Sequence, residues 1–264
     1  MRINKMLKNI KKIIVGSIIA SSSLFANGQL SIVSAGVGDL DNMTIKAYNA
    51  IKEADIFFTM DGKAGEYSSL IGNKPVYKAG HGIFANMDNT KMKKEELEQL
   101  KTETKKIVLE GHKAGKKIVL IENGDPTIYG PQISFLKEFK ELNPKIIPGM
   151  SSFNAANAAL QTAIIGGIKD ASGVTLTIGS DKNKLISTLA DSKSTLVFFM
   201  DREFDKFIDH LNTLYSKDTG IAIVINAGSK DKEKVIIATL GTIKEKVTEK
   251  LPFNHLVYVG DFLK

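Results

Sequence analysis

The sequence predicts an α/β protein of two lobes, a parallel-sheet N-terminal lobe and a mixed-sheet C-terminal lobe. In the first half, short apolar runs alternate with helical patterns, whereas strand patterns follow one another more closely in the second half. The 264 residues suffice for two domains of ordinary size. We expect lobes over residues 27–152 and 153–264, with a cleft between them of the kind that holds small ligands.

Residues 1–26 have the composition of a secretory signal peptide. Five basic residues and no acidic ones fall in this segment, and an apolar stretch over 13–20 precedes small residues that end at Ala26. The apolar stretch is shorter than the roughly 20 residues that a transmembrane helix needs. We therefore expect a periplasmic or secreted protein that meets a membrane only through this signal. An uncleaved anchor and a cytoplasmic protein with a misassigned start are the alternatives.

Composition excludes several classes of function. The chain has no cysteine, so disulfides, thiol catalysis and cysteine-ligated zinc are ruled out. Five of the net positive charges fall in residues 1–26, which leaves 31 basic and 29 acidic residues, or +2, for the remainder. This near-neutral body predicts no nucleic-acid binding. The four histidines lie far apart in the sequence, so we expect no metal site.

The first half begins with a strand–helix–strand unit. An apolar strand over 29–33 precedes a glycine-rich turn, an amphipathic helix over 46–54 and a second strand over 55–58. This order predicts parallel strands joined by a right-handed crossover.

The remaining elements follow from the same patterns. A helix is expected from Ile133, because Ile133, Leu136 and Phe139 share one face, and Thr242 is placed to cap the last helix. Glycines at 166–167 indicate a hinge between the lobes. Further strands are expected over 118–121, 174–178, 195–200, 221–226, 235–239 and 255–259, and further helices over 87–114, 154–160, 204–214 and 242–249.

Three glycine-bearing turns each follow an apolar strand and lead into a helix. They are Gly36-Val37-Gly38-Asp39, Asn123-Gly124-Asp125-Pro126 and Pro148-Gly149-Met150-Ser151-Ser152. Glycine lets a ligand approach the backbone closely, proline stiffens the turn, and aspartate accepts hydrogen bonds from hydroxyls or amines. In a parallel sheet such turns lie where ligands bind. Taken singly, each turn is equally compatible with an ordinary strand-to-helix loop.

Together the three turns resemble the tetrapyrrole methylases, the S-adenosylmethionine-dependent enzymes of corrin and sirohaem synthesis. That family's motifs are VGxGPGD followed by LTxxA, then GDPxx(F/Y)G, then PGx(S/T)SxxAA. The resemblance runs from about Leu30 to the C-terminus, and the wording Gly124-Asp125-Pro126-Thr127-Ile128-Tyr129-Gly130 is most similar to the branch that methylates the corrin C20 carbon. The resemblance also implies a homodimer.

The resemblance implies particular site residues. The family's acid/base candidates correspond most nearly to Asp61 and Lys78, although the surrounding residues match poorly and an exposed charge is the more ordinary interpretation of each. Ser34 and Val37 stand where the family has a glycine and a proline, so the first turn differs in shape. The residues implied to bind S-adenosylmethionine, with S-adenosylhomocysteine as product, are Val37, Asn123, Gly124, Asp125, Ile128, Ser151, Ser152, Met200, Gly228 and Thr239. Met200 could instead be a core methionine, and Thr239 an ordinary strand residue.

The resemblance favours an S-adenosylmethionine-dependent methyltransferase that methylates a carbon of a tetrapyrrole. The cofactor carries the reactivity in such a transfer, and the protein supplies position and a dry site. An exported enzyme would lack its methyl donor, which is made in the cytosol. The alternative is therefore an exported, non-catalytic tetrapyrrole- or haem-binding protein built on the same fold.

Overall fold

A computed structural model of the chain describes residues 28–85, 92–165, 173–192, 194–199, 201 and 203–263. The expected signal peptide, the hinge glycines and Met200 lie outside these residues. None of the helices in the described part is both long enough and apolar enough to cross a membrane.

The chain divides into two compact units. Among the described residues, the first unit contains those up to Ser34, those in 45–122 and those in 129–148, and the second contains 35–44, 123–128 and those from Gly149 onward. The sequence predicted one boundary after Ser152. The structure instead assigns two short turns of the N-terminal half to the second unit, because the turn over 35–44 is hydrogen-bonded to residues 228–230.

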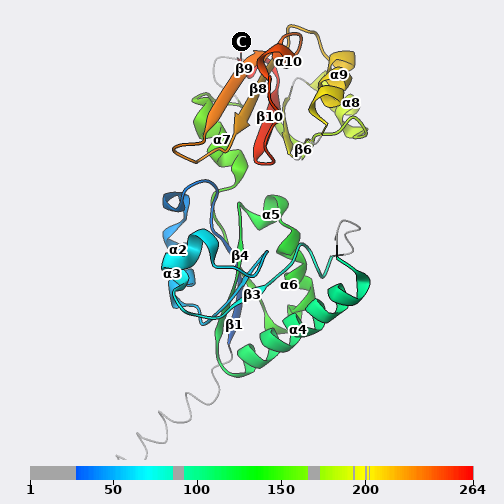
Figure 1. The fold of residues 1–264 in the computed structure, drawn as a ribbon. Coiled ribbons are helices and arrows are strands. Elements are labelled where there is room, and N and C mark those ends of the chain that lie inside the picture. Colours follow the sequence, from blue (N-terminus) through cyan, green and yellow to red (C-terminus); the bar gives the residue numbers. More distant parts are fainter. Residues whose placement is uncertain are drawn as a thin grey trace, which may run out of the picture. The chain divides into compact units, whose positions relative to one another are not determined.

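The first unit is built on a parallel sheet of order β3-β2-β4-β1-β5. The central strand β4 is buried along nearly its whole length, as expected for a parallel strand covered by helices on both faces. In Figure 1, α2 and α3 lie on one side of this sheet, and α4 and α6 lie on the other. The strands are β1 (Gln29–Ser34), β2 (Ile56–Thr59), β3 (Val76–Lys78), β4 (Lys117–Glu122) and β5 (Lys145–Ile147). The helices are α2 (Ile45–Glu53), α3 (Ser68–Ile71), α4 (Lys94–Lys113) and α6 (Ser134–Glu138).

The second unit contains a mixed sheet of order β6-β7-β10-β8-β9. Strands β6 and β7 are parallel, whereas β10 runs antiparallel to both of its neighbours and β8 and β9 form an antiparallel pair. One face packs on α8, α9 and α10, and the other on α7 (Figure 1). The strands are β6 (Val174–Ile178), β7 (Thr195–Phe199), β8 (Gly220–Ile225), β9 (Lys234–Thr239) and β10 (His255–Val259). The helices are α7 (Ser152–Leu160), α8 (Leu185–Leu189), α9 (Phe204–Leu214) and α10 (Ile243–Lys246).

Two helix predictions are wrong. The helix expected from Ile133 is broken into short segments, of which α6 has five residues and ends where Phe139 leaves the helical region. The last helix is four residues long, and Thr242 does not cap it. Its hydroxyl instead lies against Thr239, accepting a hydrogen bond from the Thr239 amide at 3.3 Å.

Candidate cofactor-binding site

The first and second glycine turns are joined directly through their backbones. The Gly124 amide donates to the Gly36 carbonyl at 2.8 Å, and both glycines have positive φ angles, of 70° and 80°. A Cβ on Gly124 would lie 3.5 Å from the Val37 side chain and 4.0 Å from the Ser152 amide nitrogen. The structure therefore brings together Val37, Gly124 and Ser152, one residue from each of the three motifs.

Gly228 joins this group through Asn42. The Asn42 amide group donates to the Gly228 carbonyl at 2.6 Å and to the Val37 carbonyl at 3.0 Å. A Cβ on Gly38 would overlap the Gly228 backbone, and one on Gly228 would lie 3.0 Å from the Val37 oxygen. Only glycines allow the two backbones to approach so closely. Gly38 and Gly228 also have positive φ angles, which glycine adopts most readily.

Asp39 completes the link between the first turn and the loop after β8. Its carboxylate accepts hydrogen bonds from the Lys230 amide at 2.8 Å and from the Ser229 hydroxyl at 3.3 Å, and its own amide donates to Gly228 at 3.0 Å. We call the hydrogen-bonded set Asp39, Asn42, Gly228, Ser229 and Lys230 the clasp. It holds the first turn in a fixed register on the loop that carries Gly228.

The second motif forms a tight turn that leads into α5 (Pro126–Tyr129). One Asp125 carboxylate oxygen accepts from the Thr127 amide at 2.8 Å and from the Thr127 hydroxyl at 2.6 Å. Asn123 and Ile128 are exposed, and Gly124 between them is buried. In the third motif the buried Ser151 caps α7, because its hydroxyl accepts from the Asn154 amide.

Thr239 lies apart from the other implied cofactor residues. It is the last residue of β9 and pairs with Gly220, the first residue of β8. Gly228 follows the other end of β8, so the length of the hairpin, about 17 Å for its five steps, separates the two. Met200 lies outside the described residues.

The acid/base candidates Asp61 and Lys78 lie beside each other in the first unit. Thr59 pairs with Lys78 across β2 and β3, and the turn after β2 carries Asp61. The Asp61 carboxylate accepts from the Lys63 amide at 3.1 Å and from the Thr59 hydroxyl at 3.4 Å, so it stabilises this turn. Its role as seen in the structure is therefore local.

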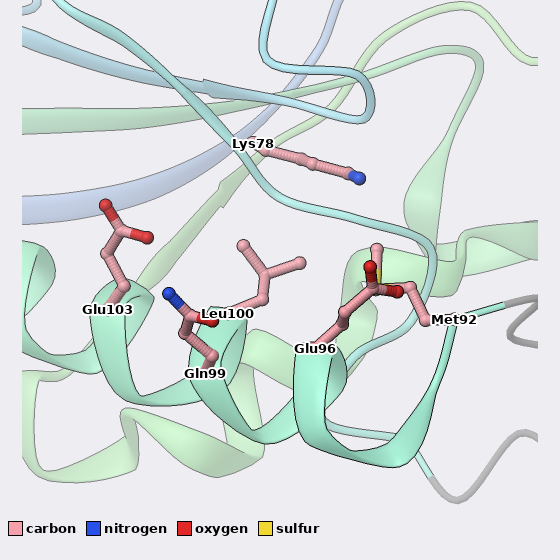
Figure 2. Close-up of a pocket in the computed structure, with 6 residues that line it drawn as sticks. All are labelled: Lys78, Met92, Glu96, Gln99, Leu100 and Glu103. Atoms are coloured by element: carbon pink, nitrogen blue, oxygen red, sulfur yellow. The ribbon is translucent and has the colours of Figure 1, made fainter.

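Lys78 lines a pocket of about 220 Å³ between β3 and the start of α4. Figure 2 shows Glu96, Gln99 and Glu103 rising from α4 toward the strand that carries Lys78. Met92 and Leu100 complete the lining. Among the described residues Lys78 forms no ion pair with Glu96 or Glu103. The carboxylates of these two glutamates make the pocket unsuited to a negatively charged tetrapyrrole.

Sequence reasoning missed Glu122, the last residue of β4. It is 5% exposed and directly precedes the second glycine turn. Burial raises the pKa of its carboxyl to about 8. An acidic residue that ends an otherwise apolar buried strand was the available sequence signal. Across the described ranges, no three His, Asp or Glu side chains are grouped to hold a metal ion.

The site is suited to a polar small molecule that is recognised mainly through the backbone. Glycine turns leave room for close approach of a ligand to the backbone, and the half-buried Asp125 carboxylate can accept hydrogen bonds from ribose hydroxyls or from an ammonium group. These features fit S-adenosylmethionine better than a metal ion or a nucleic acid. Fold and site together are those expected of an α/β protein that binds a nucleoside cofactor.

The chain belongs to the tetrapyrrole (corrin/porphyrin) methylases, because the model of that family matches residues 29–244. The cobalt-precorrin-4 C(11)-methyltransferase of Methanocaldococcus jannaschii is 32% identical over 90% of this chain and 89% of its own length. The uroporphyrinogen-III C-methyltransferase of the same organism is 29% identical over 84% of this chain and 91% of its own. S-adenosylmethionine is the cofactor of this family, so the expectations of family and cofactor are confirmed.

Solved structures confirm the fold. A cobalt precorrin-4 methyltransferase superposes with a TM-score of 0.69 at 24% identity, covering 89% of this chain and 96% of that one. A uroporphyrin-III C-methyltransferase from Thermus thermophilus, complexed with S-adenosylhomocysteine, superposes with a TM-score of 0.62 at 20% identity, covering 90% of this chain and 94% of that one. The parallel-sheet and mixed-sheet lobes predicted from the sequence are thus those of the family.

Proposed function

We propose that the protein is an S-adenosylmethionine-dependent methyltransferase that methylates a carbon of a tetrapyrrole. The observation that carries the proposal is the meeting of Val37, Gly124, Ser152 and Gly228 within the second unit. Each comes from a segment that the family resemblance implied, and the two similar methyltransferases of M. jannaschii support a ring substrate. The motif wording favours C20 as the methylated carbon, whereas one relative is named for C11.

The residues of the second unit would hold the methyl donor, which supplies an electrophilic methyl group when bound. The turn carrying Gly124 would let the donor approach the backbone closely, and the Asp125 carboxylate would accept hydrogen bonds from hydroxyl or ammonium groups. The clasp keeps the Val37 carbonyl from moving, because Asn42 donates to it. The protein's contribution is therefore position and exclusion of water.

The first test is calorimetry of the purified full chain with S-adenosylhomocysteine. We expect binding, and we expect Asp125→Ala to weaken it by about tenfold, the loss of one charge-assisted contact. Asp231→Ala, which removes an exposed aspartate on the loop after β8, is the matched control and should bind like the parent. An absence of binding by the parent chain would reject the proposal.

The second test identifies the substrate. The chain is incubated with S-adenosylmethionine and with uroporphyrinogen III or cobalt-precorrin-4, the rings named for the two relatives. Mass spectrometry should show the addition of methyl groups to one ring, and NMR of a ¹³C-methyl label should identify the carbon. Labelling at C20 would confirm the prediction from the motif, and labelling at C11 would replace it.

We also propose export of the protein, because residues 1–26 combine a basic segment with a short apolar one. N-terminal sequencing of the native protein tests this proposal. Export favours the second candidate function, a tetrapyrrole or haem carrier without turnover, and so do the altered Ser34 and Val37 positions. Tight haemin binding without S-adenosylhomocysteine binding would support the carrier. The homodimer that the family implies is tested by light scattering.

A further inference from the structure

Buried polar residues end three neighbouring strands of the first unit. Ser34, Thr59 and Glu122 are the last residues of β1, β2 and β4, and each is 7% exposed or less. These strands are adjacent in the sheet, and Ser34 pairs directly with Glu122. The three residues therefore lie along the carboxyl edge of a parallel sheet, the edge at which such sheets bind ligands.

Glu122 is the unusual member of this group. Its Oε2 atom is buried and has no hydrogen-bond partner among the described residues. Burial is the cause that raises the pKa of its carboxyl from 4.5 to about 8. The titratable residue that interacts electrostatically with it is Tyr67 on the 65–67 turn, whose hydroxyl pKa is raised by burial first, then by Glu66 and by the charge of Glu122.

A buried carboxyl oxygen without a partner costs stability, of the order of 1–3 kcal/mol for the unmade hydrogen bond alone. Glutamine or leucine at this position would avoid the penalty, so the residue calls for a functional explanation. Buried carboxyls with a pKa near the working pH are typical of groups that move protons. The implied candidate Asp61, in contrast, has its carboxylate engaged in the turn after β2.

We propose that Glu122 is the residue that accepts the proton lost by the tetrapyrrole when its carbon is methylated. This inference rests on the proposed function. A carbon–carbon bond forms as the sulfur–methyl bond breaks, and the electron pair of the broken bond stays on sulfur. The ring is then left with one positive charge. A ring N–H or C–H bond supplies the proton, its electron pair neutralises the ring, and the Glu122 carboxylate becomes a neutral acid that later releases the proton to water.

The chain itself places this carboxyl two residues before Gly124, at the start of the turn that carries the donor-binding motif. A proton acceptor at this point serves the ring and not the cofactor, so its removal should leave donor binding intact. Tyr67 does not titrate in place of this carboxyl, because burial, the neighbouring Glu66 and the Glu122 charge all raise the pKa of its hydroxyl.

The test combines turnover, donor binding and a direct titration of the carboxyl in the full chain. For the parent, kcat/KM with whichever of the two rings is methylated should rise about tenfold per pH unit below 8 and level off above it. Glu122→Gln should lower kcat by about 100-fold or more and abolish this rise, while the affinity for S-adenosylhomocysteine changes by less than about twofold. Glu110→Gln, the same chemical change on the exposed face of α4, is the control and should behave like the parent.

Infrared difference spectra give a readout that does not depend on turnover. A protonated-carboxyl band should disappear with a midpoint near pH 8 in the parent and be missing in Glu122→Gln. The inference is overturned by a Glu122→Gln variant that keeps the rate and its pH profile, or by a band that titrates near the ordinary glutamate pKa. A parent chain that binds no S-adenosylhomocysteine overturns the proposed function instead.

Discussion

The polar groups of the clasp are hydrogen-bonded, whereas the end of β4 carries a buried carboxyl oxygen without a partner in the described part of the chain. In the clasp, the Asp39 carboxylate and the Asn42 amide group each make two hydrogen bonds, and the glycines bring backbone against backbone. At the end of β4, Glu122 is buried with an unpaired oxygen. The clasp is therefore a device for holding a shape, whereas Glu122 is a group kept at a cost to stability. This difference separates the residues expected to position the methyl donor from the one expected to handle a proton.

The largest expected effect concerns the stability cost of Glu122. Its pKa in the folded chain lies above its unfolded value, so the folded state keeps a proton that the unfolded state loses as pH rises. The parent should lose stability relative to Glu122→Gln between about pH 4.5 and 8, by roughly 3–5 kcal/mol in all, and the difference should then level off. Urea unfolding of both chains at a series of pH values measures it. Parallel pH curves would show that the carboxyl is not held neutral in the fold.

A similarly large effect is expected from a side chain inside the clasp. Gly228→Val would place atoms within about 3 Å of the Val37 oxygen and the Asn42 amide, at a backbone φ of 81° that valine rarely adopts. Affinity for S-adenosylhomocysteine should fall by about 100-fold or more, or roughly 3 kcal/mol, in calorimetry. Gly173→Ala, which meets nothing closer than 3.5 Å, is the matched control. Unchanged binding by Gly228→Val would remove Gly228 from the site.

The Asp39 carboxylate of the clasp should contribute less to donor affinity than the space kept free at Gly228. Asp39→Ala removes the hydrogen bonds to the Lys230 amide and the Ser229 hydroxyl, so the first turn should become mobile and donor affinity should fall by about tenfold. Asp41→Ala, an exposed aspartate in the same turn, should leave affinity unchanged. Equal losses in the two variants would mean that general charge, and not the clasp, governs binding.

The smallest effect is expected in the core of the second unit. The Tyr258 hydroxyl donates to the Asn157 side chain at 2.8 Å and more weakly to the Phe153 carbonyl at 3.4 Å, and neither acceptor belongs to the clasp. Tyr258→Phe should lower the free energy of unfolding by about 1 kcal/mol, the net value of one hydrogen bond, with donor affinity retained. A loss of affinity in Tyr258→Phe would show that the site depends on the whole core and would weaken the distinction drawn for the clasp.

Sequence patterns predicted the two sheets and the three motif turns well, because periodicity and glycine placement are local properties. They predicted the units less well. The turn over 35–44 belongs with the C-terminal half through contacts to residues 228–230, nearly two hundred residues away, which no local pattern encodes. The helix expected after Ile133 is also broken, since the apolar periodicity continues past Phe139, where the backbone leaves the helical region.

The site residues divide in the same way. Val37, Gly124, Ser152 and Gly228 were found from motif positions and come together in the structure. Thr239 matched a motif position but lies at the far end of its hairpin. Glu122 carried no motif of its own. Its interest comes from burial and from an unmade hydrogen bond, and both are properties of the folded chain.

The most direct test of the backbone-built donor site is a two-dimensional ¹H–¹⁵N NMR spectrum of the chain titrated with S-adenosylhomocysteine. Glycine amides resonate in an uncrowded region, so Gly36, Gly124 and Gly228 can be followed individually once assigned. We predict that these three shift together, with one common dissociation constant, while Gly72 and Gly111 of the first unit stay in place. Binding that moves other amides and leaves these three unchanged would contradict the account.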